Sequence, residues 1–470
     1  MVLIIVLDFP FEIEKSIVDW YVPSCYLNQE ATMSKEGDTI IIAFISEDQT
    51  TYNYKNVIKI SYDNGNTFIG DFSFNFSTNI CYPGDPVVAI KNGKMFHAGV
   101  VYCSINNQIK GEIYFCSCSS NCHNNNTWSC KFLEMDNWQY FKDKPWMLVN
   151  KNNILIVYTT DKLSGYPRIV GYLSSDTGRT FNNVFSLNIP STYSYISQDE
   201  ENRIFVSYND FSQVNKIGFG ILRSIDGINF EDKGAVYFNY TSTTCPNFNR
   251  PAKITNNITS HYNKCAIAYL DDNCFLKVLL WDSINGFSSV SVYNNQSVNP
   301  MIGNYNNKLY ILFQSITNGT IRSCPIIERI NEWATFWVYS NDWGQTWSNV
   351  SRVSSINYGF SKSPSEHDYN GWIVDKDVLY ALWGNDFRDE QGAKVYFTKA
   401  NISLLNENKK IYNIKISKNL LFIESKENFE IYKIDGSLVK NLKKGSYKIR
   451  LKAGVYIIKF REKYVKLVIS

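Results

Sequence analysis

Charged and aromatic residues stand immediately before several short apolar segments that have the composition of β-strands. The catalytic candidates among them are Asp85, Asp143, Asp368 and Tyr369. A carboxyl group at such a position can act as a general acid or base, or can bind a cation. It can equally cap a turn by accepting hydrogen bonds at the start of a strand. The sequence leaves both interpretations open.

Four further residues are candidates for ligand binding: Arg250, Arg322, His367 and Arg388. Guanidinium groups bind carboxylates through paired hydrogen bonds, so the arginines could hold an anion if the fold brings them together. The alternative for His367 is a packing or solvent-facing role. Trp146, Trp372 and Trp383 are expected in the core, although one of them near the site could stack on a sugar ring.

A repeated turn motif, Ser-x-Asp-x-Gly-x-Thr-aromatic, indicates the β-strand units that must position these residues. It occurs at 61–68, 174–181 and 340–347, and a copy one residue shorter occurs at 224–230. The Asp side chain can accept backbone N–H bonds inside a tight turn, and the Gly supplies a positive φ. The residues assigned this structural role are Asp63, Gly65, Asp176, Gly178, Asp226, Asp342, Gly344 and Trp347.

The spacing of the motifs predicts a ring of similar β-units. Successive Asp residues of the motif lie 113, 50 and 116 residues apart, as 176 − 63, 226 − 176 and 342 − 226. Because the two long gaps are about twice the short one, each should contain a degenerate copy of the motif. With the flanking strand pairs, this gives seven units of about four short strands. Such repeats are typical of a β-propeller. We therefore predict an all-β fold with seven blades, six being the alternative.

The seventh unit lacks an outermost strand, and an amino-terminal strand could complete it. The candidate segments are Val2–Leu7 and Ile13–Tyr21. We place the propeller at residues 1–404, a linker at 405–410 and a second small domain at 411–470.

The turn motifs resemble those of the Asp-box, or bacterial neuraminidase repeat, family, and residues 31–400 are similar to sialidase-like propellers. Enzymes of that family hold the substrate carboxylate with three arginines and use a Tyr–Glu pair with an Asp. The first family arginine lies upstream of the first Asp box, whereas the first arginine here is Arg168 and the early segment Asp19–Pro23 has none. The resemblance implies a propeller that recognises extracellular glycan or protein, and the missing early arginine argues against sialidase activity. The alternative is a glycoside hydrolase with an altered site.

The composition changes in the carboxy-terminal segment, where apolar Ile and Leu residues alternate with Lys. This alternation predicts a small β-sandwich. Its phrases at 431–439, 451–459 and 466–469 resemble the sorting domain of type IX secretion, although 417–419 replaces the usual opening Asn-Pro. The resemblance implies a partnership with secretion machinery at 411–470 and release or anchoring at the surface of a Gram-negative bacterium. The alternative is an ordinary accessory sandwich. The amino terminus, 1–8, is atypical or truncated as a signal.

Charge and cysteine content narrow the class of protein further. Residues 405–470 hold 16 Lys and Arg against 6 Asp and Glu, so the body carries 47 − 16 = 31 against 44 − 6 = 38 and would repel nucleic acid. No apolar run approaches the ~20 residues of a transmembrane helix. No cofactor is expected, but a structural or pore cation stays open.

Cys116, Cys118 and Cys122 predict disulfides of a secreted protein, with zinc binding alongside His123 or free thiols as alternatives.

Overall fold

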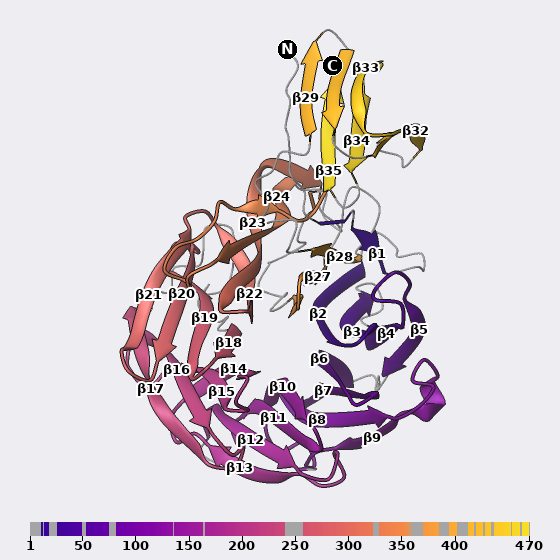
Figure 1. Ribbon diagram of the computed structural model, residues 1–470. Helices are drawn as coiled ribbons and strands as arrows, with labels where there is room; N and C mark the ends of the chain where they lie inside the picture. Colours follow the sequence, from indigo (N-terminus) through magenta and orange to yellow (C-terminus); the bar gives the residue numbers. More distant parts are fainter. Residues whose placement is uncertain are drawn as a thin grey trace.

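A computed structural model gives the arrangement of most of the chain (Figure 1). It describes residues 11–12, 14–17, 26–48, 53–74, 81–134, 136–162, 165–239, 257–322, 329–355, 357–358, 370–384, 394–401, 412–417, 420–425, 428–433, 437–452, 454–460 and 463–469. The described residues are almost entirely β-strand, as the composition predicts.

Seven four-stranded antiparallel sheets, counted over these residues, form the blades of a propeller. Blade 1 contains β2 (Tyr26–Glu36), β3 (Thr39–Asp48), β4 (Asn53–Ser61) and β5 (Ile69–Phe74). Blade 2 contains β6 (Cys81–Lys91), β7 (Lys94–Ile105), β8 (Gln108–Cys118) and β9 (Ser129–Phe132). Blade 3 contains β10 (Lys142–Asn150), β11 (Asn153–Thr160), β12 (Arg168–Ser174) and β13 (Asn182–Ser186).

The remaining blades repeat this up-and-down order. Blade 4 contains β14 (Ser191–Gln198), β15 (Ile204–Asp210), β16 (Lys216–Ser224) and β17 (Phe230–Asn239). Blade 5 contains β18 (Asn257–His261), β19 (Lys264–Leu270), β20 (Leu276–Asp282) and β21 (Gly286–Tyr293). Blade 6 contains β22 (Ser297–Tyr305), β23 (Lys308–Arg322), β24 (Arg329–Ser340) and β25 (Ser351–Arg352). Blade 7 contains β26 (Gly371–Asp375), β27 (Val378–Gly384), β28 (Val395–Asn401) and β1 (Lys15–Ser16).

The ring closes through both its inner and its outer strands. The first strands of the blades contact one another in turn, and β26 of blade 7 contacts β2 of blade 1. On the outside, β1 adds to β28 in antiparallel register, with Lys15 opposite Phe397 and Ser16 opposite Tyr396. The seventh blade is therefore completed from within the predicted segment Ile13–Tyr21, whereas Val2–Leu7 lies outside the described residues.

Each repeated turn is held by its Ser and Asp side chains. In blade 1, Asp63 Oδ1 accepts from Ser61 Oγ and from the Thr67 backbone N, both at 2.8 Å, and Ser61 Oγ accepts from Gly65 N at 2.8 Å. The bonds from Thr67 are the largest cause lowering the pKa of Asp63 to about 2. Equivalent bonds form around Asp176 and Asp342, and a shortened set forms around Asp226.

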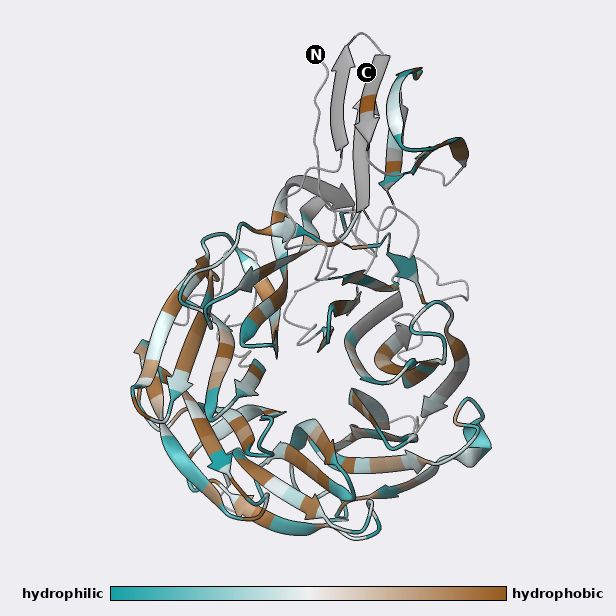
Figure 2. Cartoon of the chain, viewed as in Figure 1, coloured by the Kyte–Doolittle hydropathy of each residue, from teal (hydrophilic) through white to brown (hydrophobic). Residues whose placement is uncertain are grey.

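The core lies between neighbouring blades, where the strands carry their apolar residues (Figure 2). The contact between blades 7 and 1 includes Phe397 and Leu382 against Phe44 and Ile42, all fully buried. Such interfaces can only be filled when the blades stand side by side, because a single blade leaves both faces uncovered. The ring is therefore the unit that buries the core.

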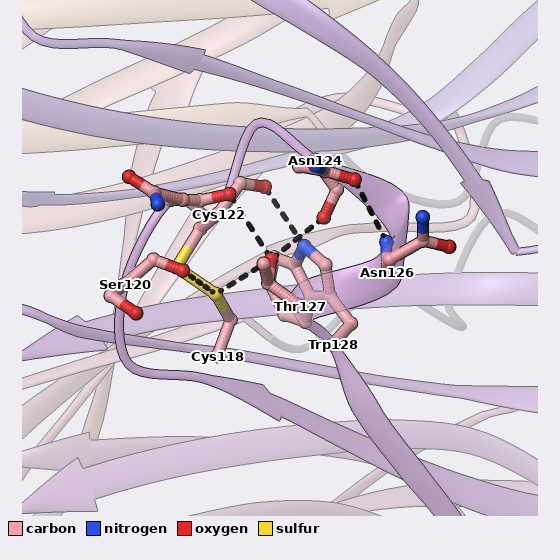
Figure 3. Close-up of a disulfide and its surroundings, with 8 residues drawn as sticks. Cys118, Ser120, Cys122, Asn124, Asn126, Thr127 and Trp128 are labelled. Atoms are coloured by element: carbon pink, nitrogen blue, oxygen red, sulfur yellow. Dashed lines mark hydrogen bonds between the residues drawn. A yellow bond between two sulfur atoms is a disulfide. The ribbon is translucent and has the colours of Figure 1, made fainter.

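Blade 2 carries three disulfides among the described cysteines. Cys81 pairs with Cys103 across β6 and β7, Cys116 pairs with Cys130 across β8 and β9, and Cys118 pairs with Cys122. The last pair closes the loop before the short helix η1 (Asn125–Thr127), where Trp128 Nε1 donates to the Cys122 carbonyl at 2.9 Å (Figure 3). These bonds consume the thiols that a zinc site would need, so the zinc and free-thiol alternatives for Cys116, Cys118 and Cys122 are wrong.

The carboxy-terminal segment forms two sheets that share one small core. The sheets are β29 (Tyr412–Ser417), β30 (Leu420–Ser425) and β33 (Gly445–Arg450), and β31 (Phe429–Lys433), β32 (Leu438–Leu442), β34 (Gly454–Phe460) and β35 (Lys463–Ile469). Ile423 and Ile449 from the first sheet meet Ile431 and Ile458 from the second. The predicted β-sandwich is confirmed, and its limits at 411–470 stay a prediction. No helix in the described part of the chain is long and apolar enough to cross a membrane.

Candidate functional site

The start of each inner strand lies at the end of the propeller opposite the repeated turns. In blade 2, β6 begins with Cys81 opposite Cys103 and ends with Lys91 opposite Lys94, in a tight hairpin. The repeated turns join third to fourth strands and therefore lie at the same end as these hairpins. The predicted site residues Asp85 and Asp143 lie near the strand starts, at the other end of the axis.

Five inner strands carry a β-bulge at the same place, counted over the described residues. Two residues of the inner strand face one residue of the second strand within 29–32, 84–87, 143–146, 192–195 and 298–301. In every bulge one non-glycine residue adopts a left-handed backbone conformation, and these residues are Glu30, Asp85, Lys144, Tyr193 and Asn299. Bulges re-aim side chains, and left-handed non-glycine residues are rare, so the repetition marks this level of the axis.

Three of the bulge residues converge on one another from three different blades. Lys144 Nζ donates to Glu30 Oε1 at 2.9 Å and to Asp85 Oδ1 at 2.5 Å. The side chains of Asp85 and Glu30 are only 2% and 7% exposed, whereas that of Lys144 is 15% exposed. Because the two buried carboxylates share one ammonium group, the pairing stabilises all three charges at the axis.

Tyr102 joins this group to the second predicted carboxyl group. From β7 its hydroxyl lies within hydrogen-bonding distance of Asp85 Oδ2 and, at 2.5 Å, of Asp143 Oδ1. Its ring packs on Tyr82, and a Cβ at Gly84 would lie 2.8 Å from it, so a glycine is needed there for close approach. Both predicted carboxyl groups therefore meet at one phenol.

The electrostatics separate the two carboxyl groups. Burial raises the pKa of Asp143, and the Asp85 carboxylate raises it further, to about 7. Burial acts on Asp85 in the same direction, but the Lys144 ammonium and its hydrogen bonds outweigh it and lower the pKa of Asp85. Burial and both carboxyl groups raise the pKa of Tyr102 well above its ordinary value. Near neutral pH Asp85 is therefore ionised and Tyr102 keeps its proton, while Asp143 titrates in this pH range.

Beyond the bulges, a cavity of about 230 Å³ lies among the inner strands. Its walls come from β2, β6, β10, β22 and β26, and the lining residues include the half-buried Trp146 and Trp372 together with Thr32 and Asn370. Trp383, by contrast, is fully buried in the core between blades 6 and 7. Two of the three tryptophans thus border this cavity.

A second polar group lies at blades 6 and 7 and contains only uncharged side chains. Asn299 Nδ2 donates to Gln314 Oε1 at 3.0 Å, and Gln314 Nε2 donates to the hydroxyl of Tyr358 at 3.0 Å. Asn370 Nδ2 donates to the Asn299 carbonyl at 3.4 Å. The charged groups described at the axis are therefore gathered on blades 1 to 3.

The structure brings together only part of the predicted site. Asp85 and Asp143 lie in one cluster, and Arg322 ends β23 with its backbone opposite Arg329, its side chain being outside the description. The predicted residues that lie outside the described part of the chain are Arg250, His367, Asp368, Tyr369 and Arg388. They stay predictions.

Glu30, Tyr102 and Lys144 belong to the cluster and were missed by the sequence reasoning. In the sequence Lys144 is marked by the proline that follows it, as Asp85 is, whereas Glu30 carries no such mark. In the structure four of the five left-handed residues lie six positions before the last residue of the inner strand. The pairs are Glu30 and Glu36, Asp85 and Lys91, Lys144 and Asn150, and Asn299 and Tyr305. No comparable signal marks Tyr102, which reaches the site from a second strand.

The cluster offers little to a metal ion. Lys144 Nζ lies between the two buried carboxylates, where a cation would otherwise be held. Over the described residues no group of three or more His, Cys, Asp or Glu has the arrangement of a metal site. The chemistry available here is hydrogen bonding by carboxyl, phenol and ammonium groups.

Comparisons with known proteins give matches in structure alone. No family profile and no curated protein matches the sequence. A protein of unknown function from Dyadobacter fermentans is 11% identical with a TM-score of 0.46, over 83% of this chain and 99% of that chain. A mutant of Trypanosoma rangeli sialidase displaying trans-sialidase activity is 10% identical with a TM-score of 0.45, over 97% and 87%. A Penicillium chrysogenum alpha-L-arabinanase is 11% identical with a TM-score of 0.45, over 84% and 99%. Similarities this distant carry no inference about what this chain binds.

Proposed function

We propose that this protein is a secreted or cell-surface β-propeller that binds an extracellular glycan, free or on a glycoprotein, at the axial end of blades 1 to 3. The observation that carries the proposal is the convergence of Glu30, Asp85, Lys144, Tyr102 and Asp143 beside a cavity with two tryptophan rings. Carboxyl, ammonium and phenol groups match sugar hydroxyls, and indole rings match the apolar face of a sugar.

The geometry favours binding over hydrolysis by the two aspartates. Glycosidases that use two carboxyl groups keep them roughly 5 Å apart or more, with the scissile bond between them. In this site one atom, the hydroxyl oxygen of Tyr102, lies within hydrogen-bonding distance of both Asp85 and Asp143, so the two carboxyl groups are too close for a scissile bond between them. Asp85 is also engaged by Lys144 and is not free to act as a nucleophile. The proposal is therefore a binding protein, and the part of it that excludes sialidase activity rests on the missing early arginine.

The extracellular location is supported by the cysteines. Three disulfides join six described cysteines in one blade, and such bonds persist in oxidising compartments. We extend the proposal to the β-sandwich, which would engage secretion machinery through residues 411–470 and deliver the propeller to the outer surface of a Gram-negative bacterium. Expression with residues 411–470 deleted should retain the propeller inside such a cell, and unchanged export would refute this role.

The binding proposal is tested by a glycan array with two matched variants. Tyr102→Phe removes the hydroxyl that joins Asp85 to Asp143, and should weaken binding of the best glycan at least about tenfold, the worth of one charge-assisted hydrogen bond. Tyr237→Phe is the control, because Tyr237 donates to the buried Asp210 at 2.5 Å but lies on an outer strand. Absence of binding to any glycan, or equal loss in both variants, would overturn the proposal.

A glycoside hydrolase is the second candidate, and the protonation of Asp143 is the observation that favours it. A carboxyl group with a pKa near 7 could donate a proton to a leaving group. Fluorogenic glycosides incubated with the protein and with Asp143→Asn separate the two functions. Turnover that disappears in the variant would establish the enzyme and refute a binding role alone.

A further inference from the structure

The left-handed bulge residues lie close to the cavity, because four of them precede by two positions a residue that lines it. They recur at one level of five inner strands, yet their chemical types differ: Glu30, Asp85, Lys144, Tyr193 and Asn299. The bulge backbone is thus common to the blades while the side chain it presents is not. A repeated backbone with variable side chains is the arrangement in which specificity resides in the side chains.

The charges of the described cluster add up to a negative site. Glu30 and Asp85 contribute two negative charges and Lys144 one positive charge, while Asp143 titrates near neutral pH. Lys142, which precedes Asp143 in the chain, is also buried, and its ammonium group pairs with Glu112 at 2.5 Å and with Asp136 at 2.8 Å. Among these groups the negative charges outnumber the positive ones, which disfavours an anionic ligand at the cluster.

Buried hydroxyl groups beside the cluster lack partners in the described part of the chain. Thr159 is 2% exposed, is the cross-strand partner of Asp143, and its Oγ1 makes no hydrogen bond. Directly opposed residues of an antiparallel pair point to the same face, so Thr159 lies beside the Asp143 carboxyl group. In the next bulge Thr192 Oγ1 and Ser194 Oγ are also unpartnered. Such groups can donate to or accept from the hydroxyls of an uncharged sugar.

We infer that the axial site selects uncharged sugars over carboxylate-bearing sugars, and that Glu30, Asp85 and Lys144 are the selecting positions. The inference rests on the proposed glycan binding and names its ligand class. A sugar hydroxyl can accept from the ammonium group and donate to a carboxylate, whereas a ligand carboxylate would face Asp85 and Glu30 in a desolvated space. Like charges brought together in this way discriminate strongly against the wrong ligand.

The experiment uses matched pairs of glycans on the full-length protein. The pairs are a glucoside and its glucuronide, an oligogalactoside and an oligogalacturonate, and a galactoside and its sialylated form. We expect the uncharged member of the bound pair to bind at least tenfold more tightly at pH 7. In a triple variant, Glu30→Gln with Asp85→Asn and Lys144→Met, the pair should bind within about threefold of each other, because no buried charge is left unpaired or repelled.

Glu36→Gln is the matched control for charge. Glu36 lies on the same inner strand as Glu30 but accepts from Asn92 N and Gly93 N at the opposite end of the blade. Its removal should leave the preference unchanged. If the carboxylate-bearing member binds as tightly as the uncharged one, or if Glu36→Gln shifts the preference as much as the triple variant, the inference is overturned while glycan binding stands. If no member of any pair binds, the proposed function itself fails.

Discussion

Tyr102 has one hydroxyl proton, and two carboxyl groups lie within reach of it. Since the phenol can donate its proton to only one of them, the contact with the other is favourable when that carboxyl group is protonated and donates to the phenol oxygen. The pKa directions assign that proton to Asp143, because Asp85 is held ionised by Lys144. The site is thus a chain of donors running from Asp143 through Tyr102 to Asp85, and its order depends on one titratable proton.

This proton makes the stability of the protein depend on pH. The pKa of Asp143 rises from an ordinary 3.8 to about 7 in the fold, so between these values the folded state holds a proton that the unfolded chain has lost. The free energy of unfolding should therefore fall as pH rises from about 4 to 7 and stay lower above it. The titratable groups that face the Asp143 carboxyl group are those of Asp85, Glu30, Tyr102 and Lys144.

Asp143→Asn keeps a donor to Tyr102 without the titration and should lose this decline. Urea unfolding at pH 4.5 and 7.5 gives the change in the free energy of unfolding between the two pH values, and this change is compared between wild type and variant. The lowered pKa of Asp85 and the raised pKa of Tyr102 place their titrations outside this interval. Identical pH dependence in the two proteins would contradict the assignment.

The site residues could be predicted from the sequence only in part, for a reason visible at this scale. Asp85 was found because Asp85-Pro86 stands before an apolar strand, and Lys144-Pro145 carries the same mark. Asp143 was chosen in place of its neighbour Lys144, since a bulge inserts one residue and shifts the register that a regular strand would give. Glu30 has no proline after it, and Tyr102 arrives through cross-strand geometry that spacing does not encode.

At the scale of the element, the repeated turn is also a joint between blades. A Cβ at Gly65 of blade 1 would lie 2.5 Å from the Phe397 ring of blade 7, and one at Gly344 of blade 6 would lie 2.9 Å from Leu280 of blade 5. The glycine therefore supplies both the positive φ of the turn and the space for the neighbouring blade. The sequence predicted the first role, and the second becomes visible only when the blades are placed.

Gly65→Ala and Gly37→Ala form a matched pair that separates these roles. Both glycines have positive φ, +81° and +58°, but a Cβ at Gly37 would meet nothing within 4 Å. Gly37→Ala should cost about 1–2 kcal/mol of unfolding free energy from backbone strain. Gly65→Ala should cost about 1–3 kcal/mol more, because it overpacks against Phe397. Thermal or denaturant unfolding measures both, and equal losses would show that the joint is not tight.

At the scale of the whole molecule, ring closure depends on a few residues from the start of the chain. Phe11 is 1% exposed and packs edge-on against Trp337 of blade 6, with ring centroids 5.7 Å apart, and near Trp372 of blade 7 at 6.5 Å. The missing outer strand of the seventh unit predicted that an amino-terminal segment would close the ring. The sequence did not reveal Phe11 as an anchor, because a single aromatic residue has no periodicity.

Phe11→Ala tests whether this anchor holds the last blade. Removing a fully buried phenylalanine costs about 3–5 kcal/mol, so the midpoint of denaturant unfolding should fall clearly. Val214→Ala is the control, since Val214 is 87% exposed and its truncation should change the free energy of unfolding by less than about 0.5 kcal/mol. A loss in Phe11→Ala no larger than in the control would mean that the ring is closed without it.

The closure of blade 7 by β1 also determines when during synthesis the ring can be completed. Lys15 pairs with Phe397, so the two partners are 397 − 15 = 382 residues apart in the chain. At a synthesis rate of about 5–20 residues per second, β1 waits roughly 20–80 s for its partner strand to be made. Individual hairpins can form early, but the outer edge of β28 has no partner strand until both ends of the propeller are present. A chain interrupted before residue 397 therefore lacks the edge that β1 must join, and blade 7 can be completed only after this residue has been synthesised.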